Sequence, residues 1–164
     1  MTENLLAANI GEIVVSGSDD DVLVAYGLGS CVAICLYDPQ VSVAGMIHAL
    51  LPEAPKRNGV HIVEGKFVDR GLPLLLDEIE ALGARRRRLK VRLCGGANML
   101  IAPGFDGTPN IGERNIAMAE SMLSVIGLKI QAQATGGNAG RTVKMWVSDG
   151  QVTVKTLGRG EKPL

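Results

Sequence analysis

Cys31 and His48 are the two residues of this chain whose types and spacing could do covalent chemistry together. Valine-rich runs on both sides of Asp38-Pro39-Gln40 are typical of two adjacent antiparallel strands. With Pro39 and Gln40 at the centre of the turn, the hairpin predicts that Cys31 lies directly opposite His48. Opposed side chains have Cβ atoms about 4.5–5.5 Å apart, which allows a hydrogen bond. Proline cannot take the positive φ of a primed turn, so the hairpin could contain a bulge, which would shift this register by one.

A thiol beside an imidazole is a nucleophile paired with a base. The pKa of a free cysteine is about 8.5, and an adjacent imidazole can lower it by stabilising the ion pair. Gly29 would let the backbone approach a substrate carbonyl closely, and the amide of Cys31 is a candidate oxyanion donor. The alternative is structural, with Cys31 a small buried strand residue and His48 a satisfied histidine at a strand end.

Other motifs give weaker indications. Gly95–Asn98 lacks the Lys-Ser/Thr of a phosphate loop and the spacing of a dinucleotide fingerprint. A metal site at Cys31, Cys35 and His48 fails on reach, because strand residues four apart are roughly 13 Å apart. We therefore expect no metal and no cofactor. Gly136–Arg141 is either a plain glycine turn or a loop at the mouth of a cleft, with Gly136 and Gly137 lining it and Arg141 presented to a substrate or partner.

Composition limits the class of protein. A length of 164 residues predicts one domain, 1–164, with an ordered core of about 12–156 and a loose tail. Lys+Arg and Asp+Glu both number 17, so no net charge favours nucleic acid or an anionic membrane. Three cysteines do not form a disulfide framework, and neither a signal peptide nor an apolar stretch of about 20 residues is found. We expect a cytoplasmic protein.

Periodicity predicts two main helices and about nine strands. Leucines and an isoleucine at helical spacing place the first helix before Gly83, beginning near Phe67 or with Pro73 in its first turn. The second begins at Asn110, which Glu113 would help to cap. The run Arg85–Arg88 between them is either a solvated run near a helix end or a patch for an acidic partner. Because strands and helices do not alternate throughout, we expect an α+β sandwich with both helices over one sheet face.

Five motifs occur in one order along the chain, and together they resemble the CheD family of chemoreceptor glutamine deamidases. They are Gly27-Leu28-Gly29-Ser30-Cys31-Val32, His48-Ala49-Leu50-Leu51-Pro52, Gly95-Gly96-Ala97-Asn98-Met99, Ile111-Gly112-Glu113-Arg114-Asn115 and Gly136-Gly137-Asn138-Ala139-Gly140-Arg141. The resemblance implies an α/β/β three-layer fold similar to a cysteine deamidase toxin. It also implies a hydrolase of chemotaxis signal transduction that converts glutamines on the cytoplasmic helices of chemoreceptors to glutamate.

The resemblance implies that Cys31 is the nucleophile and His48 the base. Donors near Gly29 and Ser30 would hold the oxyanion. The family's third catalytic residue is a threonine, and the position that matches it here is Ala25, six before the cysteine. Another group must then orient His48, and Ser30, Asn98 or a backbone carbonyl are candidates. Family members also bind the phosphatase CheC and stimulate it, so a mainly regulatory binding module with weak deamidase activity is the alternative.

Overall fold

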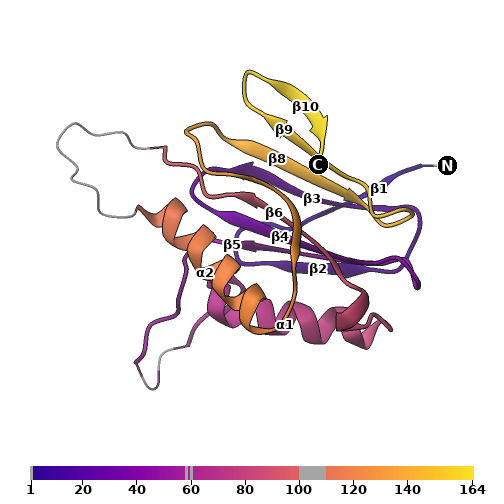
Figure 1. Ribbon diagram of the computed structural model, residues 1–164, viewed down its shortest axis with the longest axis horizontal. Helices are drawn as coiled ribbons and strands as arrows, with labels where there is room; N and C mark the ends of the chain where they lie inside the picture. The colour runs from indigo at the N-terminus through magenta and orange to yellow at the C-terminus, as the bar shows by residue number, and fades with distance from the viewer. Residues whose placement is uncertain (1, 58, 60, 100–109) are drawn as a thin grey trace.

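The strands form two five-stranded sheets, and two α-helices pack as a third layer on one of them (Figure 1). The computed structural model describes residues 2–57, 59, 61–99 and 110–164. The outer sheet has the order β1 (Asn4–Ala7), β3 (Asp21–Leu28), β8 (Arg141–Trp146), β9 (Val152–Thr156) and β10 (Gly160–Pro163). The central sheet has the order β2 (Ile13–Ser16), β5 (Val43–Ala49), β4 (Val32–Asp38), β6 (Lys90–Gly95) and β7 (Ile130–Thr135). The predicted three-layer α+β sandwich is confirmed.

Strands β4 and β5 lie at the centre of the molecule, and all their residues are buried. Alternate residues of a strand point to opposite faces, so each strand contributes to two cores. Val32, Ile34 and Leu36 of β4 pack in the core that the central sheet shares with the helices. Ala33 and Cys35 pack in the core between the two sheets, and Cys31 belongs to that same core.

The helices cover the central sheet. The α1 helix (Val68–Ala81) begins directly after Phe67, so Pro73 lies inside it rather than in its first turn. A Cβ atom at Gly71 would clash with Ile47, so this glycine lets α1 lie close to β5. The α2 helix (Ile111–Val125) has the predicted cap, because Asn110 Oδ1 accepts a hydrogen bond from the Glu113 amide at 2.9 Å.

The β4–β5 hairpin has a different register from the predicted one. Val32 pairs with Ala49 and Ala33 pairs with His48, so Cys31 is not opposite the histidine. The two-residue turn is wrong because Pro39 cannot take a positive φ, and the chain instead uses a four-residue connection, 39–42. Ser42 supplies the left-handed residue with a φ of 50°. Cys31 therefore becomes a diagonal neighbour of His48 on the same face of the sheet.

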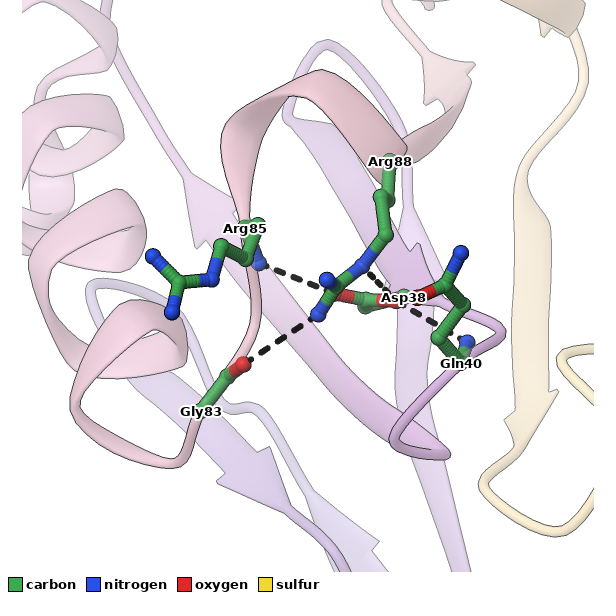
Figure 2. Close-up of polar contacts among 5 residues, drawn as sticks. All are labelled: Asp38, Gln40, Gly83, Arg85 and Arg88. Atoms are coloured by element: carbon green, nitrogen blue, oxygen red, sulfur yellow. Dashed lines mark hydrogen bonds and ion pairs between the residues drawn. The ribbon is translucent and has the colours of Figure 1, made fainter.

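The far end of β4 holds a buried ion pair between Asp38 and Arg88, which belongs to the single-turn helix η2 (Arg86–Arg88) (Figure 2). Arg88 Nε donates to both Asp38 oxygens at 2.9–3.0 Å, and the amides of Arg85 and Gln40 donate at 2.9 and 3.0 Å. Burial alone would raise the pKa of Asp38, but these hydrogen bonds and the Arg88 charge outweigh it and lower the pKa. Arg86 pairs with Glu80 at 2.6 Å, so the arginine run is partly a structural element.

Both ends of the chain contribute strands beyond the expected core of about 12–156. Residues Asn4–Ala7 form β1, which pairs in parallel with β3. The expectation of a loose tail is wrong, because Gly160–Pro163 forms β10 and pairs with β9. Within the described residues, neither helix is both long and apolar enough to cross a membrane.

Candidate functional site

Cys31 and His48 lie at one end of the central sheet, on the face that packs against the outer sheet. Cys31 directly precedes β4 and is 6% exposed, while His48 lies in β5 and is 2% exposed. Their strands place them diagonally across the Ala33–His48 pair. Diagonal neighbours in an antiparallel pair are roughly 7–8 Å apart, with Cβ atoms somewhat closer. The two side chains are therefore neighbours on one face of the sheet, although they do not lie directly opposite each other.

The ring of His48 is held by one hydrogen bond. Its Nδ1 lies 2.9 Å from the carbonyl oxygen of Ala8. Because a carbonyl can only accept, this contact assigns the proton of the neutral ring to Nδ1 and leaves Nε2 unprotonated. Among the described residues, His48 Nε2 is buried and has no hydrogen-bond partner. The ring thus offers a free basic nitrogen inside the protein.

The Ala8 carbonyl is itself fixed by the turn that follows β1. The Ala8 amide donates to Val24 of β3 at 2.8 Å, which ties this turn to the outer sheet. The Gly11 amide donates to the His48 carbonyl at 2.8 Å, and the His48 amide donates to Glu12 at 3.1 Å. The turn therefore bonds to the backbone of His48 as well as to its ring.

Burial sets the protonation states of the pair. Burial raises the pKa of the Cys31 thiol, and the amide of the same residue offsets this only in part. Burial also lowers the pKa of His48, against smaller opposing effects of the Ala8 hydrogen bond and the Glu12 charge. Both shifts favour a neutral thiol and a neutral imidazole over a thiolate–imidazolium ion pair at neutral pH.

The backbone around Cys31 is held by the turn after β6. The Gly96 amide donates to the Cys31 carbonyl and the Ala97 amide donates to Gly29, both at 2.8 Å. A Cβ atom at Gly95 would clash with the Cys31 carbonyl, and Gly95 has a φ of 105° that favours glycine. The glycines of this motif permit the close approach that fixes the cysteine.

Asn115 of α2 joins the segments that carry Cys31 and His48 from the helix layer. It is fully buried, and its Nδ2 donates to the carbonyls of Ser30 at 2.9 Å and Leu50 at 3.0 Å. Ser30 directly precedes Cys31, and Leu50 follows His48 by two residues. The Oδ1 of Asn115 is the other buried polar side-chain atom without a partner in the described part of the chain. One side chain thus links the loop that precedes Cys31 to the segment that follows β5.

The glycine loop between β7 and β8 supports the same turn. The Gly136 amide donates to Gly95 at 3.0 Å, and the Asn98 amide donates to Gly137 at 2.8 Å. Arg141 Nη1 donates to the Gly136 carbonyl at 2.8 Å and approaches that of Gly95 at 3.4 Å. At least one nitrogen of Arg141 is therefore used inside this loop.

A partly open hollow of about 440 Å³ lies beside His48. It is lined by Ala8, Asn9, Ile10, Tyr26 and His48. Ile10 and Tyr26 are each 51% exposed, so the wall is apolar and faces solvent. In the described ranges no group of three or more His, Cys, Asp or Glu residues could hold a metal ion.

Comparisons with known proteins show the family of this chain. The family model for CheD chemotactic sensory transduction matches residues 50–156. A probable chemoreceptor glutamine deamidase CheD of Desulforamulus reducens is 42% identical, over 93% of this chain and 95% of its own. A chemoreceptor glutamine deamidase CheD of Thermotoga maritima is 37% identical, over 93% and 92%. The chain belongs to the CheD family.

The five motifs that resemble the CheD family meet at one place. Hydrogen bonds join the Cys31 motif to the Gly95 motif, the Gly95 motif to the Gly136 motif, and Asn115 to the Cys31 and His48 motifs. A Cβ atom at Gly112 would lie 2.7 Å from the Ala97 carbonyl, so α2 begins in contact with the same turn. The motifs are therefore linked to one another largely through backbone groups.

Two residues of this CheD-family site were not identified from sequence. Ala8 acts through its carbonyl oxygen, and its side chain carries no signal. Asn115 lies in a motif that was recognised, and a polar residue on the otherwise apolar buried face of an amphipathic helix is the signal that could have identified it. Ala25, which matches the family threonine, is fully buried in β3 opposite Val143 and offers only a methyl group.

Proposed function

We propose that this protein is a chemoreceptor glutamine deamidase, with Cys31 as nucleophile and His48 as base. The observation that carries the proposal is the free, buried Nε2 of His48 on the face it shares with Cys31. The substrate class comes from the names of the relatives, which are called chemoreceptor glutamine deamidases. We place the reaction on the receptors' cytoplasmic helices.

The reaction replaces the amide nitrogen of a glutamine side chain by oxygen from water. As Cys31 sulfur attacks the carboxamide carbon, His48 Nε2 takes the thiol proton. The C–N bond breaks when His48 gives that proton to the amide nitrogen. Ammonia departs, and the substrate carbonyl carbon remains bound to Cys31 sulfur as a thioester. Water then attacks the thioester with His48 again as base, and the C–S bond breaks to give glutamate and the thiol. Backbone donors near Gly29 and Ser30, with the Asn98 side chain as a candidate, would bind the oxyanion.

A neutral resting pair is compatible with this mechanism. Catalytic hydrogen bonds are often long before substrate binds and tighten in the complex. Proton transfer during attack requires an unprotonated Nε2, and the lowered pKa of His48 keeps it in that form at neutral pH. The Ala8 carbonyl takes the orienting role that a threonine has in the family pattern, because it already binds the Nδ1 proton.

The test is conversion of glutamine to glutamate in purified receptor cytoplasmic fragments, counted by mass spectrometry. We expect conversion by the wild type and none by Cys31→Ala. Cys35→Ala is the matched control, because Cys35 lies on the same strand face but is fully buried away from the site's loops. Conversion that survives in Cys31→Ala would overturn the assignment of the nucleophile.

A second measurement is the rate of Cys31 alkylation by iodoacetamide as a function of pH. Because burial raises the thiol pKa, Cys31 should label no faster than an ordinary thiol at pH 7 and should accelerate above the usual cysteine pKa of about 8.5. Fast labelling at pH 6–7 would show a resting ion pair and contradict the neutral-pair mechanism.

The regulatory alternative rests on Ala25. Without the family threonine, the protein could act chiefly by docking on the CheC phosphatase and stimulating it. Absence of conversion by the wild type, together with faster dephosphorylation by CheC in its presence, would favour this second function.

A further inference from the structure

Tyr26 is an exposed aromatic residue at the edge of the candidate site. It lies where the pairing of β3 with β8 is irregular, between Ala25 and Leu28, and such irregularities redirect side chains. It lines the 440 Å³ hollow beside His48 and also a second hollow of about 250 Å³. Tyr26 is the residue that the two hollows share. Together they are called the Tyr26 groove.

The second hollow is cationic. Besides Tyr26, its lining residues are Thr142, Lys144, Lys155 and Glu161. Lys144 and Lys155 are diagonal neighbours on adjacent strands β8 and β9, which lie side by side in the outer sheet (Figure 1). Neither forms an ion pair with a carboxylate among the described residues. Glu161 accepts a hydrogen bond from Thr153 at 2.6 Å, which occupies one of its oxygens.

The charge of the groove comes from the solvent face of the outer sheet. Alternate residues of β8 point to opposite faces, so Lys144 lies on the face away from the buried Val143, whereas Arg141 shares the face of Val143 and does not line this hollow. Glu161 pairs directly with Lys155 across β10 and β9, so two ammonium groups and one carboxylate line the hollow. A chain with no net charge thus carries a locally positive hollow beside Tyr26.

We propose that the Tyr26 groove binds the segment of the substrate protein that flanks the target glutamine, with an acidic side chain of that segment on Lys144 and Lys155. The apolar hollow beside His48 holds the neighbouring small or aliphatic side chain against Ile10 and Tyr26. The occupant is an acidic protein segment because the two ammonium groups outnumber the one carboxylate, Glu161, that lines the same hollow, and an excess of positive charge attracts carboxylates and repels basic segments. This inference rests on the proposed function and names the chemistry of its substrate.

Binding is measured separately from turnover, in the inactive Cys31→Ala protein, with receptor cytoplasmic fragments as the probe. We expect Lys144→Glu/Lys155→Glu to raise the dissociation constant by about tenfold or more at low salt, because each exposed ion contact contributes up to about fivefold. Lys144→Gln/Lys155→Gln should give a smaller increase. Glu161→Gln should lower the dissociation constant, and all differences should shrink at high salt.

The control is Lys90→Glu/Lys129→Glu, which makes the same change of net charge at exposed positions beside the central sheet. It should leave the dissociation constant unchanged, and Cys31 alkylation in an otherwise wild-type background should be the same in all variants. If Lys144→Glu/Lys155→Glu and this control bind the receptor fragments with equal affinity, the proposed role of the Tyr26 groove is wrong. Absence of glutamine conversion by the wild type would overturn the proposed function, whatever the binding result.

Discussion

The two ends of β4 carry buried polar groups that are satisfied to very different degrees. At the Asp38 end, both carboxylate oxygens accept hydrogen bonds, from Arg88, Arg85 and Gln40 (Figure 2). At the Cys31 end, His48 Nε2 and Asn115 Oδ1 are buried without partners in the described part of the chain. One strand of seven residues therefore joins a completed polar network to an incomplete one.

This difference separates a structural site from the proposed active site. A buried carboxylate with every oxygen bonded gains nothing from a ligand, and its partners hold the end of β4 to η2. A buried basic nitrogen without a partner costs free energy unless it serves a ligand or a reaction. At the incomplete end, burial also favours the uncharged forms of both groups, since it raises the pKa of Cys31 and lowers that of His48.

The largest expected effect is on stability, from Arg88→Ala at the completed end. Removing Arg88 leaves Asp38 buried without its cation, which should lower the free energy of unfolding by about 3–5 kcal/mol. The deamidation rate per folded molecule should not change. Urea unfolding followed by the fluorescence of the single tryptophan, Trp146, measures the effect.

Arg86→Ala is the matched control, because its ion pair with Glu80 is exposed on both sides and should contribute less than about 1 kcal/mol. The pH dependence adds a second check. The folded pKa of Asp38 is lowered, so its stabilisation is present above the unfolded pKa of about 3.9 and is lost as pH falls through the folded value. Arg88→Ala should lack this acid-dependent loss, and an equal loss in both proteins would contradict the contribution assigned to the pair.

A smaller effect is expected from Asn115→Ala at the incomplete end. It leaves the carbonyls of Ser30 and Leu50 without their donor, which should cost about 1–3 kcal/mol of stability. Because the spacing of Cys31 and His48 is then less well fixed, kcat should fall about tenfold with KM nearly unchanged. Steady-state kinetics per folded molecule measures the split.

Leu123→Ala is the control for this variant, since Leu123 is buried in the same helix but packs in the core below the central sheet. It should cost about 2–5 kcal/mol and leave kcat per folded molecule unchanged. Equal loss of kcat in both variants would mean that Asn115 is only structural. Asn115→Asp should be worse than alanine for kcat, because a carboxylate oxygen would face the two carbonyls.

Sequence patterns predicted much of this architecture because they depend on local chemistry. The cap at Asn110, the amphipathic spacing of α1 and the valine-rich runs of β4 and β5 each encode one element, and all form. Where the pattern was short or had no side-chain periodicity, prediction failed. Strand β1 has four residues and β10 is fully exposed, so neither has a buried face to detect.

The site was predictable in its residue types and less so in its geometry. The sequence predicted a two-residue turn at Pro39-Gln40, with a one-residue bulge as the alternative, and the structure instead uses a four-residue connection, 39–42. The group on His48 Nδ1 is a backbone carbonyl, which any residue at position 8 could supply. Long-range contacts through the backbone leave no mark in composition or spacing, so they had to be found in the fold.

The smallest expected effect is from Ala25→Thr, which restores the family's threonine beside the incomplete end. Nδ1 of His48 has one hydrogen, and the Ala8 carbonyl already accepts it, so a new hydroxyl can only compete for the same bond. We expect kcat per folded molecule to change by less than about threefold. Stability should fall by about 1–3 kcal/mol, because Ala25 is fully buried and has no room for a larger side chain. A tenfold rise in kcat would show that the Ala8 carbonyl does not orient the His48 ring sufficiently. The Nδ1 of His48 would then lack an adequate partner, in addition to His48 Nε2 and Asn115 Oδ1.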